Sequence, residues 1–477
     1  MEKNNEVRKY EDAKSVHVFA WPFLVSEEEE KLSDKLGKKG WIREQIDYRE
    51  GQGVKAKTHY MLEQYLSSDA RQIFKGAENT VCELYKYPLE QPATYHIELK
   101  KATYDLEIEE IELHIYKFGV GILFIKTLNT TATGVGDMIL INNKGRDIRI
   151  PFLPDAKDEY IACAEKLGII YGQDSYITDF REKIVNYYGK KENAAQEVSK
   201  PAQFLQDVLN VRLGKKGVSA QEEEIKVRAT TDDRMYVMSI IRDEQLSKKI
   251  KQENWSDDDE KELYQIIFVD DDSGATCQNK AMRKDFLEKN VYARWKDEGT
   301  VFGITEYAFH CLTSDDKGIN AFVIRPMYAE YLYMFSLVIA QRLAILRFSE
   351  EAGELAGRTG KKDGLVCSSI SKKLIALQEN YIVFLNRMMI SEFSCQQQGI
   401  EMYDMMEDLM MVNKERDLLD AQLQGLFEIV NTSNGTKNNR WTMALTVIAT
   451  IAAIIQIWEP AIKPLWEIIK NAFNCTP

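Results

Sequence analysis

The stretch WTMALTVIATIAAIIQIW, Trp441 to Trp458, decides how the rest of this 477-residue chain is interpreted. Its eighteen residues carry no charge, and as a helix they would extend ~27 Å, close to the hydrocarbon thickness of a bilayer. A tryptophan stands at each end, where indole rings favour the headgroup zone. The stretch therefore predicts a transmembrane helix, and the alternative is a buried core helix of a soluble protein.

The flanking residues predict how this span is oriented. Lys437 and Arg440 lie just before it and Glu459 follows it, so the positive-inside rule places the N-terminal part of the chain in the cytoplasm. Residues 460–473 have an apolar face opposite three charged side chains, which fits an amphipathic helix at the membrane interface. A second, shortened crossing is the alternative. We therefore expect a membrane region at 437–477, in a cell or inner membrane.

A long heptad pattern precedes the membrane region. Between Ile370 and Val430, apolar residues recur at alternating spacings of three and four, and no proline interrupts the run. This period is typical of a coiled coil or a long bundle helix, which would be ~90 Å long here. Together with an apolar helix at Tyr328–Phe348 it predicts a helical stalk over 326–436. The alternative is two helices interrupted near Gly399.

Composition limits the function classes that remain. The net charge of −13 argues against general nucleic-acid binding. Seven cysteines occur without a CxxC pair, so we expect reduced cytosolic thiols and no disulfide framework or zinc site. The polar N-terminus predicts no signal peptide. Five scattered histidines and the lack of a hydrolase, zinc-protease or dinucleotide motif give no support for an enzyme.

The residues before the stalk predict a mixed α/β domain in two parts, 1–155 and 156–325. The segments Ser15–Val25 and Thr94–Leu128 are rich in strand formers, and the second contains a hairpin bend at Phe118–Gly121. Further strands are predicted at 138–141 and 148–150 around an Asn-Asn-Lys-Gly turn, and at 225–229, 235–241 and 263–269, whereas 155–213 is predicted mostly helical.

Two acidic runs flank the last predicted strand, at Asp257–Glu260 and at Asp270–Asp272. Carboxylates at this density can hold Mg²⁺ or Ca²⁺ through oxygen ligands. Solvated loop charges are the alternative, so a metal site stays an open possibility at this point.

The run NRWTMALTVIATI, Asn439 to Ile451, resembles the start of the pore-lining helix in the CorA family of divalent-cation channels. The resemblance implies a homo-oligomer, a pentamer, that carries Mg²⁺. One departure stands against selective import. The family's Gly-Met-Asn filter signature is absent, and Lys463-Pro464-Leu465 occupies its place. A ring of lysines there would repel cations. The residues that the resemblance places along the pore are Asn439, Thr442, Thr446 and Thr450.

Three other stretches are similar to divergent CorA-like membrane proteins encoded beside type III CRISPR systems. They are Asn142–Pro154, Asp232–Val237 and Arg294–Phe309. The resemblance implies a membrane effector of antiviral defence that is gated by a nucleotide messenger, of the cyclic oligoadenylate or S-adenosylmethionine–AMP type. That branch carries two adjacent arginines in the first stretch, whereas here Asp147 follows Arg146.

These stretches supply the expected ligand site. Arginine forks suit phosphate, aromatic rings can stack a base, and aspartates can bond a ribose or an amino group. A structural role, in strand-end ion pairs or in the core, is the alternative for each residue. The expected ligand-binding residues are Arg146, Arg149, Asp232, Asp233, Arg234, Trp295, Thr300, Thr305 and Tyr307.

The sequence thus predicts an α+β cytosolic domain followed by a long coiled-coil-like helical stalk and a C-terminal transmembrane helix. The first expected function is a messenger-gated channel or membrane effector. The alternatives are a divalent-cation transporter with a degenerate filter and a membrane-anchored scaffold without a pore. The expected partners are further copies of the chain, the lipid bilayer and a small nucleotide.

Overall fold

The computed structural model describes most of the first 433 residues. The predicted pore residues Asn439, Thr442, Thr446 and Thr450 and the helix at 460–473 lie outside the described residues, as does the predicted span apart from 447–448. The described residues are 13–25, 29–46, 54–75, 80–151, 153, 162–210, 213–214, 224–230, 234–252, 255–271, 276–316, 323, 325–359, 368–433 and 447–448.

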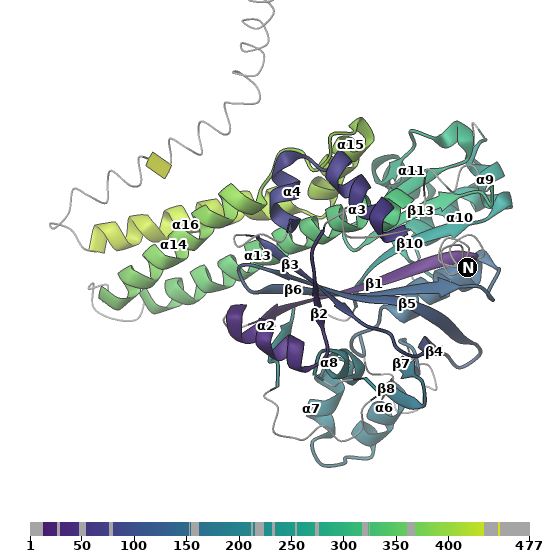
Figure 1. Cartoon of the computed structure of the whole chain (residues 1–477), viewed down its shortest axis with the longest axis horizontal. Coiled ribbons are helices and arrows are strands. Elements are labelled where there is room, and N and C mark those ends of the chain that lie inside the picture. The colour runs from purple at the N-terminus through teal and green to yellow at the C-terminus, as the bar shows by residue number, and fades with distance from the viewer. Residues whose placement is uncertain are drawn as a thin grey trace, which may run out of the picture. The chain divides into compact units, whose positions relative to one another are not determined.

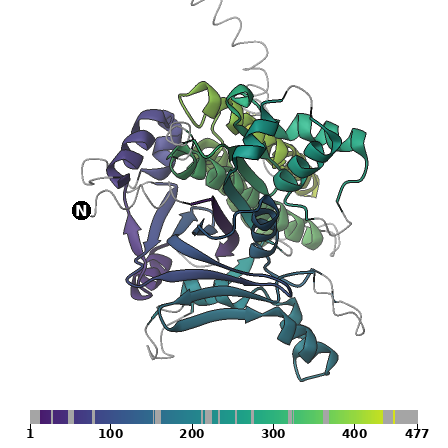
Figure 2. The ribbon, with the colours of Figure 1, turned by 90° about the vertical axis from the view of Figure 1, so that its right-hand side faces the viewer.

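The chain divides into two compact units. The first comprises 1–347 and 380–417, and the second comprises 348–379 and 418–477. The first unit contains a 13-stranded mixed sheet (Figure 1, Figure 2). Its main path runs in the order β11 (Val291–Tyr292), β12 (Val301–Ile304), β13 (Ala308–Thr313), β10 (Tyr236–Arg242), β1 (Ser15–Val25), β6 (Val120–Asn129), β5 (Thr103–Tyr116), β4 (Ala93–Glu98), β7 (Lys166–Tyr171) and β8 (Asp174–Asp179).

Three short strands join this path from the side: β2 (Ile42–Glu44) pairs with β3 (Cys82–Tyr87), β3 also pairs with β5, and β9 (Val227–Ala229) pairs with β1. β10 and β13 run parallel, and the other strand pairs are antiparallel. The predicted strand Ser15–Val25 is confirmed as β1, at the centre of the sheet. Pro22 is tolerated there because pairing with β10 ends at Ala20 and pairing with β9 begins at Phe23.

The predicted hairpin is also confirmed, as β5 and β6 joined through residues 117–119. Phe118 and Gly119 both have positive φ, +75° and +67°. A Cβ on Gly119 would lie 2.6 Å from the carbonyl oxygen of Val25, so this position needs glycine on two counts.

Helices cover both faces of the sheet. The helices are α2 (Glu29–Lys38), α3 (Val54–Tyr65), α4 (Ser68–Phe74), α5 (Val135–Gly145), α6 (Phe180–Tyr188), α7 (Ala194–Ser199), α8 (Gln203–Asn210), α9 (Glu244–Ile250), α10 (Asp257–Phe268), α11 (Lys280–Asn290), the 3₁₀ turn η2 (Lys296–Glu298), α13 (Glu330–Thr359), α14 (Ser368–Met388), α15 (Gln397–Leu409) and α16 (Val412–Ser433).

The side chains of alternate strand residues meet different helices. On one face, Phe19 and Ile125 belong to a core that includes Ile141 of α5 and Phe204 of α8. On the other face, the His114 ring lies 5.3 Å from that of Tyr333 on α13. The ring of Phe309 lies 6.1 Å from that of Phe335 on the same helix. The first unit is therefore a layered α/β domain, and the coarse fold prediction is confirmed.

Two predicted strands are wrong because they are helices. The segment 138–141 belongs to α5, whose buried residues Met138, Ile141, Asn142 and Gly145 follow a helical i, i+3, i+4, i+7 spacing. The segment 263–269 belongs to α10, which begins with a capping box between Ser256 and Asp259. The region 155–213, predicted mostly helical, contains the β7–β8 hairpin as well as α6, α7 and α8.

The predicted continuous stalk helix is wrong too. Residues 389–396 separate α14 from α15, and residues 410–411 separate α15 from α16. The first break returns the chain to the domain, because the backbone N–H of Cys395 donates to the Tyr65 carbonyl (2.7 Å) and that of Ser67 donates to the Phe393 carbonyl (2.9 Å). Residues 380–417 consequently belong to the first unit.

The expected apolar helix at Tyr328–Phe348 is present as part of α13. Among the described residues, one helix is long and apolar enough to cross a membrane, Arg325–Arg358, with a mean hydropathy of 1.3. Its most apolar window is 83% buried inside the protein, as expected for a core helix.

The second unit is helical where it is described. It contains the end of α13, the start of α14 and most of α16. Its buried residues are Phe348, Ala352 and Leu355 on α13, Leu374 and Leu377 on α14, and Leu419, Leu423, Leu426, Phe427 and Val430 on α16.

Candidate functional site

A row of buried polar side chains crosses the sheet beneath α5. Antiparallel pairing sets His17 of β1 opposite Ser239 of β10, and parallel pairing sets Ser239 opposite His310 of β13. A Cβ on Gly145 would lie 2.5 Å from the Phe19 ring, so this glycine lets α5 approach the sheet closely and brings Asn142 onto the row. The side chains are at most 1% exposed.

Hydrogen bonds connect this row end to end, and we name it the polar row. Its six members are Asn129, Ser15, His17, Asn142, Ser239 and His310. The distances are 2.8 Å from Asn129 Nδ2 to Ser15 Oγ, 2.8 Å from Ser15 Oγ to His17 Nε2, 2.7 Å from His17 Nδ1 to Asn142 Oδ1, 3.1 Å from Asn142 Nδ2 to Ser239 Oγ, and 2.8 Å from Ser239 Oγ to His310 Nδ1.

The direction of these hydrogen bonds follows from the Asn129 end. Asn129 Oδ1 accepts from the backbone N–H groups of Thr131 and Ala132, so its Nδ2 must donate to Ser15. Ser15 then donates to His17 Nε2, and His17 Nδ1 donates to Asn142.

At the far end of the row, Asn142 Nδ2 donates to Ser239, and the Ser239 hydroxyl lies 2.8 Å from His310 Nδ1. A hydroxyl that accepts one hydrogen bond can donate or accept the next, so this contact fits either tautomer of neutral His310.

Both histidines of the polar row are neutral at pH 7. Burial lowers the pKa of His17 to about 4, although its bond to Asn142 opposes the shift. Burial also lowers the pKa of His310 to about 3, with smaller contributions from the charges of Arg146 and His17. His310 Nε2 has no hydrogen-bond partner among the residues that the structure describes.

A charged cluster lies where α5 ends, one helical turn after Asn142 of the polar row. Arg146 is 4% exposed, and its Nη2 donates to the Val269 carbonyl (3.3 Å). Its own carbonyl accepts from the Met235 N–H (2.7 Å), and Asp147 forms a β-bridge with Arg234. The backbone hydrogen bond of Met235 to Arg146 and the bridge of Arg234 to Asp147 therefore bring the predicted residues Arg146 and Arg234 together.

Acidic residues complete this cluster. Burial raises the pKa of Asp270, and the charges of Arg146 and Arg234 oppose that shift. Lys144 Nζ lies 3.1 Å from a carboxylate oxygen of Asp271, and Asn143 donates to the same oxygen (2.9 Å). Within the described part of the chain, no group of three or more His, Cys, Asp or Glu side chains is placed to hold a metal ion.

The second predicted group, Thr305 and Tyr307, lies in the turn between β12 and β13. The Tyr307 carbonyl accepts from the Val237 N–H (3.0 Å), and its ring lies 5.3 Å from that of Tyr236. The guanidinium of Arg342 on α13 lies 5.4 Å from the Tyr307 ring centre. This turn therefore connects the strand that follows Arg234 to helix α13.

Arg342 makes more contacts than this one. It forms an ion pair with Glu306, its Nη1 donates to the Tyr236 hydroxyl (3.4 Å), and its Nε lies 3.4 Å from a Glu415 carboxylate oxygen on α16. We call Arg342 and these four partners, including Tyr307, the Arg342 junction.

The remaining predicted residues do not join the cluster. Thr300 and Thr305 lie at opposite ends of β12, and Thr300 Oγ1 bonds Thr313 Oγ1 (2.8 Å). Trp295 packs on Phe302 with ring centres 5.8 Å apart, which is the structural alternative. Arg149 is partly buried, and Asp232 and Asp233 lie outside the described residues. Among the described residues, no hydrogen bond, ion pair or ring contact joins Trp295 or Thr300 to the charged cluster, and their ligand-binding role stays a prediction.

The sequence reasoning missed the polar row and Arg342. A signal existed for both. Ser15 and His17 are polar residues at alternate positions of an otherwise apolar strand, so they share a face, and Arg342 interrupts an apolar helix. Such residues are buried only where partners satisfy them.

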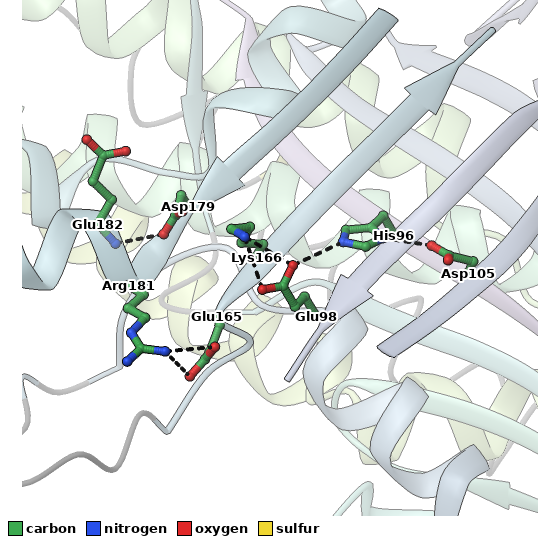
Figure 3. A network of polar contacts seen from close by, with 8 residues as sticks. All are labelled: His96, Glu98, Asp105, Glu165, Lys166, Asp179, Arg181 and Glu182. Atoms are coloured by element: carbon green, nitrogen blue, oxygen red, sulfur yellow. Dashed lines mark hydrogen bonds and ion pairs between the residues drawn. The ribbon is translucent and has the colours of Figure 1, made fainter. Parts of the chain in front are cut away.

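A second polar network lies on β4, β5 and β7 (Figure 3). Lys166 Nζ lies 3.0 Å from a Glu98 oxygen, Glu98 lies 3.6 Å from His96 Nε2, and His96 Nδ1 lies 2.7 Å from Asp105. Arg181 pairs with Glu165 at 3.2 Å nearby. Most of these side chains are partly or well exposed, which is typical of a surface ion network.

Comparison of this chain with known protein families, with curated proteins and with solved structures gives no match. The contacts of the charged cluster and of the Arg342 junction are therefore the observations on which a function is argued.

Proposed function

We propose that this chain is a ligand-gated membrane effector. In this proposal a small anionic nucleotide binds the cytosolic α/β unit near Arg146 and Arg234. Binding shifts α13 and α16, and the C-terminal apolar segment of an oligomer then opens a pore or perturbs the bilayer. The Arg342 junction is the observation that carries the proposal. It couples the β12–β13 turn to the two helices that continue from the first unit into the second.

The chemistry of the charged cluster supports an anionic ligand. In a chain with a net charge of −13, Arg146, Arg234 and Lys144 gather beside Asp147, Asp270 and Asp271, so the cluster itself carries no net negative charge. Arginine binds phosphate with two parallel hydrogen bonds, which suits a nucleotide messenger. A cyclic oligoadenylate or an S-adenosylmethionine–AMP conjugate has this chemistry, and the proposal assigns no catalytic step to the protein.

Gating requires that the ligand prefers one arrangement of the junction over another. Arg342 is held by the Glu306 and Glu415 carboxylates and by two tyrosines. A ligand that moves Arg234 or Tyr307 changes the position of Tyr236 and Glu306, and Arg342 must follow. A buried Arg with several partners has few alternative positions, so its response is discrete rather than gradual.

The first experiment is calorimetry on the detergent-purified full chain with cyclic oligoadenylates, the S-adenosylmethionine–AMP conjugate, ATP and Mg²⁺. We expect one nucleotide to bind. Arg146→Ala and Arg234→Ala are each expected to weaken that binding about ten-fold or more, because each removes a charge-assisted bond. Arg181→Ala is the matched control, since the Arg181 side chain is 61% exposed and pairs with Glu165 in the surface network.

The second experiment measures ion flux in vesicles that contain the protein. Ligand is expected to raise the flux of the wild type, and Arg342→Gln is expected to bind the ligand with unchanged affinity yet lose the flux response. Binding of Mg²⁺ alone, with flux that needs no nucleotide, would favour the transporter. No flux under any condition would leave the scaffold.

A further inference from the structure

Two buried hydroxyl groups hold residues 389–396, the joint between α14 and α15. Each hydroxyl bonds a carboxyl group and also lies within hydrogen-bond distance of a backbone carbonyl. The two sets of carboxyl, hydroxyl and carbonyl residues are Glu330, Ser394 and Tyr65, and Glu407, Tyr403 and Ile390. A hydroxyl has one hydrogen to donate, so the protonation state of each carboxyl decides whether that hydrogen goes to the carboxyl or to the carbonyl.

The first carboxyl, Glu330 of α13, bonds the Ser394 hydroxyl, and both side chains are fully buried. Ser394 Oγ lies 3.0 Å from the Tyr65 carbonyl oxygen and accepts from the Gln396 N–H (3.1 Å). A Cβ on Gly399 would lie 3.1 Å from Glu330 Oε1, so α15 packs directly on this pair. A hydroxyl that donates to Tyr65 can only accept from Glu330, which must then carry the proton itself.

Burial also favours a protonated Glu330. It raises the pKa of this carboxyl, and the hydrogen bond of Ser394 opposes the shift. The titratable neighbour on the same helix is Tyr331, whose pKa is raised by burial and then by the Glu330 charge. Glu330 Oε2 has no hydrogen-bond partner among the described residues, which costs a neutral carboxyl less than a carboxylate. The hydrogen bonds and the burial therefore both indicate a neutral Glu330.

The second carboxyl, Glu407, is partly buried, whereas Tyr403 is fully buried. The Tyr403 hydroxyl lies 2.8 Å from Glu407 Oε1 and 3.3 Å from the Ile390 carbonyl oxygen. It also accepts from Gln341 Nε2 of α13 (2.8 Å), which donates to the Met388 carbonyl (2.8 Å) as well. An ionised Glu407 takes the Tyr403 hydrogen, because it is the nearer and the charged acceptor. A protonated Glu407 donates to Tyr403 instead, and the Tyr403 hydrogen is left for Ile390.

The surroundings of Glu407 place this change near neutral pH. Burial raises the pKa of Glu407 to about 7, against the hydrogen bond of Tyr403. The charge of Arg416 on α16 also opposes the shift, whereas Asp404 and Asp408 on α15 add to it. Because Glu407 is partly exposed, it exchanges its proton with solvent, which the fully buried Glu330 does not do directly.

We propose that the joint is a proton-operated latch, in which Glu330 is the protonated anchor and Glu407 is the switch. With Glu407 protonated, Tyr403 donates to the Ile390 carbonyl and the joint is closed. When Glu407 releases its proton to solvent, Tyr403 donates to the carboxylate, the Ile390 carbonyl loses its donor and the joint loosens. Since Gln341 bonds the same hydroxyl, the latch also contacts α13, the helix of the Arg342 junction. It needs no ligand, so this inference does not rest on the proposed function.

The test is amide hydrogen exchange of the full chain in detergent at pH 6 and pH 8, which bracket the pKa of Glu407, about 7. Each rate is divided by the intrinsic exchange rate at the same pH. We expect residues 389–396 to be roughly five-fold better protected at the lower pH, because one hydrogen bond to the joint is lost at the higher pH.

Three variants separate the switch from other causes of pH dependence. Glu407→Gln presents an N–H donor to Tyr403 at either pH and is expected to keep the joint protected at both. Tyr403→Phe keeps the ring but removes the hydroxyl, so we expect low protection at both. Glu392→Gln is the matched control, since Glu392 is an exposed carboxyl in the same joint, and it is expected to behave as the wild type. A pH dependence that survives in Glu407→Gln would overturn the inference.

A second measurement covers the case in which Tyr403→Phe does not fold. Infrared spectra of the full chain at the same two pH values contain the C=O band of each protonated carboxyl group. We expect one such band to disappear at the higher pH and to be missing from Glu407→Gln. A second band, missing from Glu330→Gln, is expected to persist at both pH values. A pH-sensitive band that Glu407→Gln retains unchanged, or no band that depends on Glu330, would show that the latch is wrong.

Discussion

Two polar networks on the same sheet use similar side chains in opposite surroundings. The polar row beneath α5 joins two histidines through asparagine and serine, all buried. The surface network of Figure 3 joins His96 to the carboxylates of Glu98 and Asp105, and Glu98 to Lys166, across β5, β4 and β7. The hydrogen bonds have similar lengths, so distance alone does not separate the two.

The two networks differ in their exposure to solvent. In the surface network water can replace any partner that is lost, and salt screens the charges. Its shifts come from direct bonds: the hydrogen bond from Lys166 lowers the pKa of Glu98. In the polar row every lost partner leaves a buried group unsatisfied. The difference teaches that side-chain orientation is fixed in the polar row and remains adjustable in the surface network.

The largest expected effect comes from breaking the polar row at its middle. Asn142→Ala leaves His17 Nδ1 without its acceptor and Ser239 Oγ without its donor, both in the core. We expect the free energy of unfolding to fall by about 3 kcal/mol or more. Chemical denaturation measures the loss. Glu98→Gln at the surface is the comparison, and an equal loss in both variants would contradict the distinction.

The next largest effect is expected when the pH is lowered, because the buried histidines of the polar row resist protonation. The pKa values of His17 and His310 are lowered to about 4 and about 3 in the folded protein, against about 6.5 in the unfolded chain. The unfolded state therefore binds more protons below pH 6.5, and stability falls as the pH drops from 7 to 5. Each histidine is expected to contribute about 2 kcal/mol of that loss.

The measurement is denaturation at pH 7 and at pH 5 for the wild type and His310→Phe, because this substitution removes one titrating ring. Ser239 of β10 bonds His310, and the charges of Arg146, which follows α5, and of His17 on β1 act on its pKa. The variant is expected to lose less stability between the two pH values. An unchanged pH dependence would mean that His310 is solvated.

A partly buried acid, Glu407, gives a smaller effect with the opposite sign. Burial raises the pKa of Glu407 to about 7, and its Oε1 accepts from the Tyr403 hydroxyl at 2.8 Å. The stability that this raised pKa contributes is full below the unfolded value near 4.3 and is lost as pH rises through 7. Glu407→Gln is expected to raise stability at pH 8 by about 1 kcal/mol and to lower it slightly at pH 5, measured by thermal unfolding.

The smallest effect is expected at the surface. Lys166→Ala removes an ion pair whose side chains are 38% and 31% exposed, and we expect a loss of about 0.5 kcal/mol or less. Raising the salt concentration to about 1 M should remove even this difference. A loss comparable to that of Asn142→Ala would show that the edge strands depend on the network.

Strands with a clear local sequence pattern were predictable from the sequence. β1 and the β5–β6 hairpin have continuous strand formers and a turn that needs positive φ. α5 was not predicted, because its short apolar run fits a strand as well as a helix and the glycine beside it suggested a turn. The i, i+3, i+4, i+7 spacing that includes Asn142 was the signal that could have decided it.

The break in the long helix was not predictable from the heptad count. The eight residues 389–396 keep the register of the pattern across a loop, so the seam continues although the helix does not. Three seam positions around it, Ser391, Cys395 and Gln398, are weakly apolar or polar, and they mark the place where the chain returns to Tyr65. The backbone hydrogen bonds that cause the return, such as Cys395 N–H to the Tyr65 carbonyl, join residues more than 300 positions apart.

The candidate site was predicted in part for a related reason. Arg146, Arg234 and Tyr307 are brought together by strand pairing around Met235, whereas β12 separates Trp295 and Thr300 from them. The polar row was not predicted from the sequence, because its hydrogen bonds join residues 97 and 125 positions apart. Only the sheet register, which no local pattern contains, places His17, Ser239 and His310 in one line.

The central place of β1 in the sheet has a consequence for folding during synthesis of the protein. β1 leaves the ribosome before both of its neighbours, because β6 ends at Asn129 and β10 ends at Arg242. At ~5–20 residues per second, synthesis of the chain from Val25 to Arg242 takes roughly 10–40 s. During that interval β1, an apolar strand that the finished protein buries on both faces, lacks at least one of its partner strands β6 and β10. We expect chaperones that bind extended apolar segments to bind β1 in the nascent chain, and slower translation would lengthen the time for which β1 is exposed.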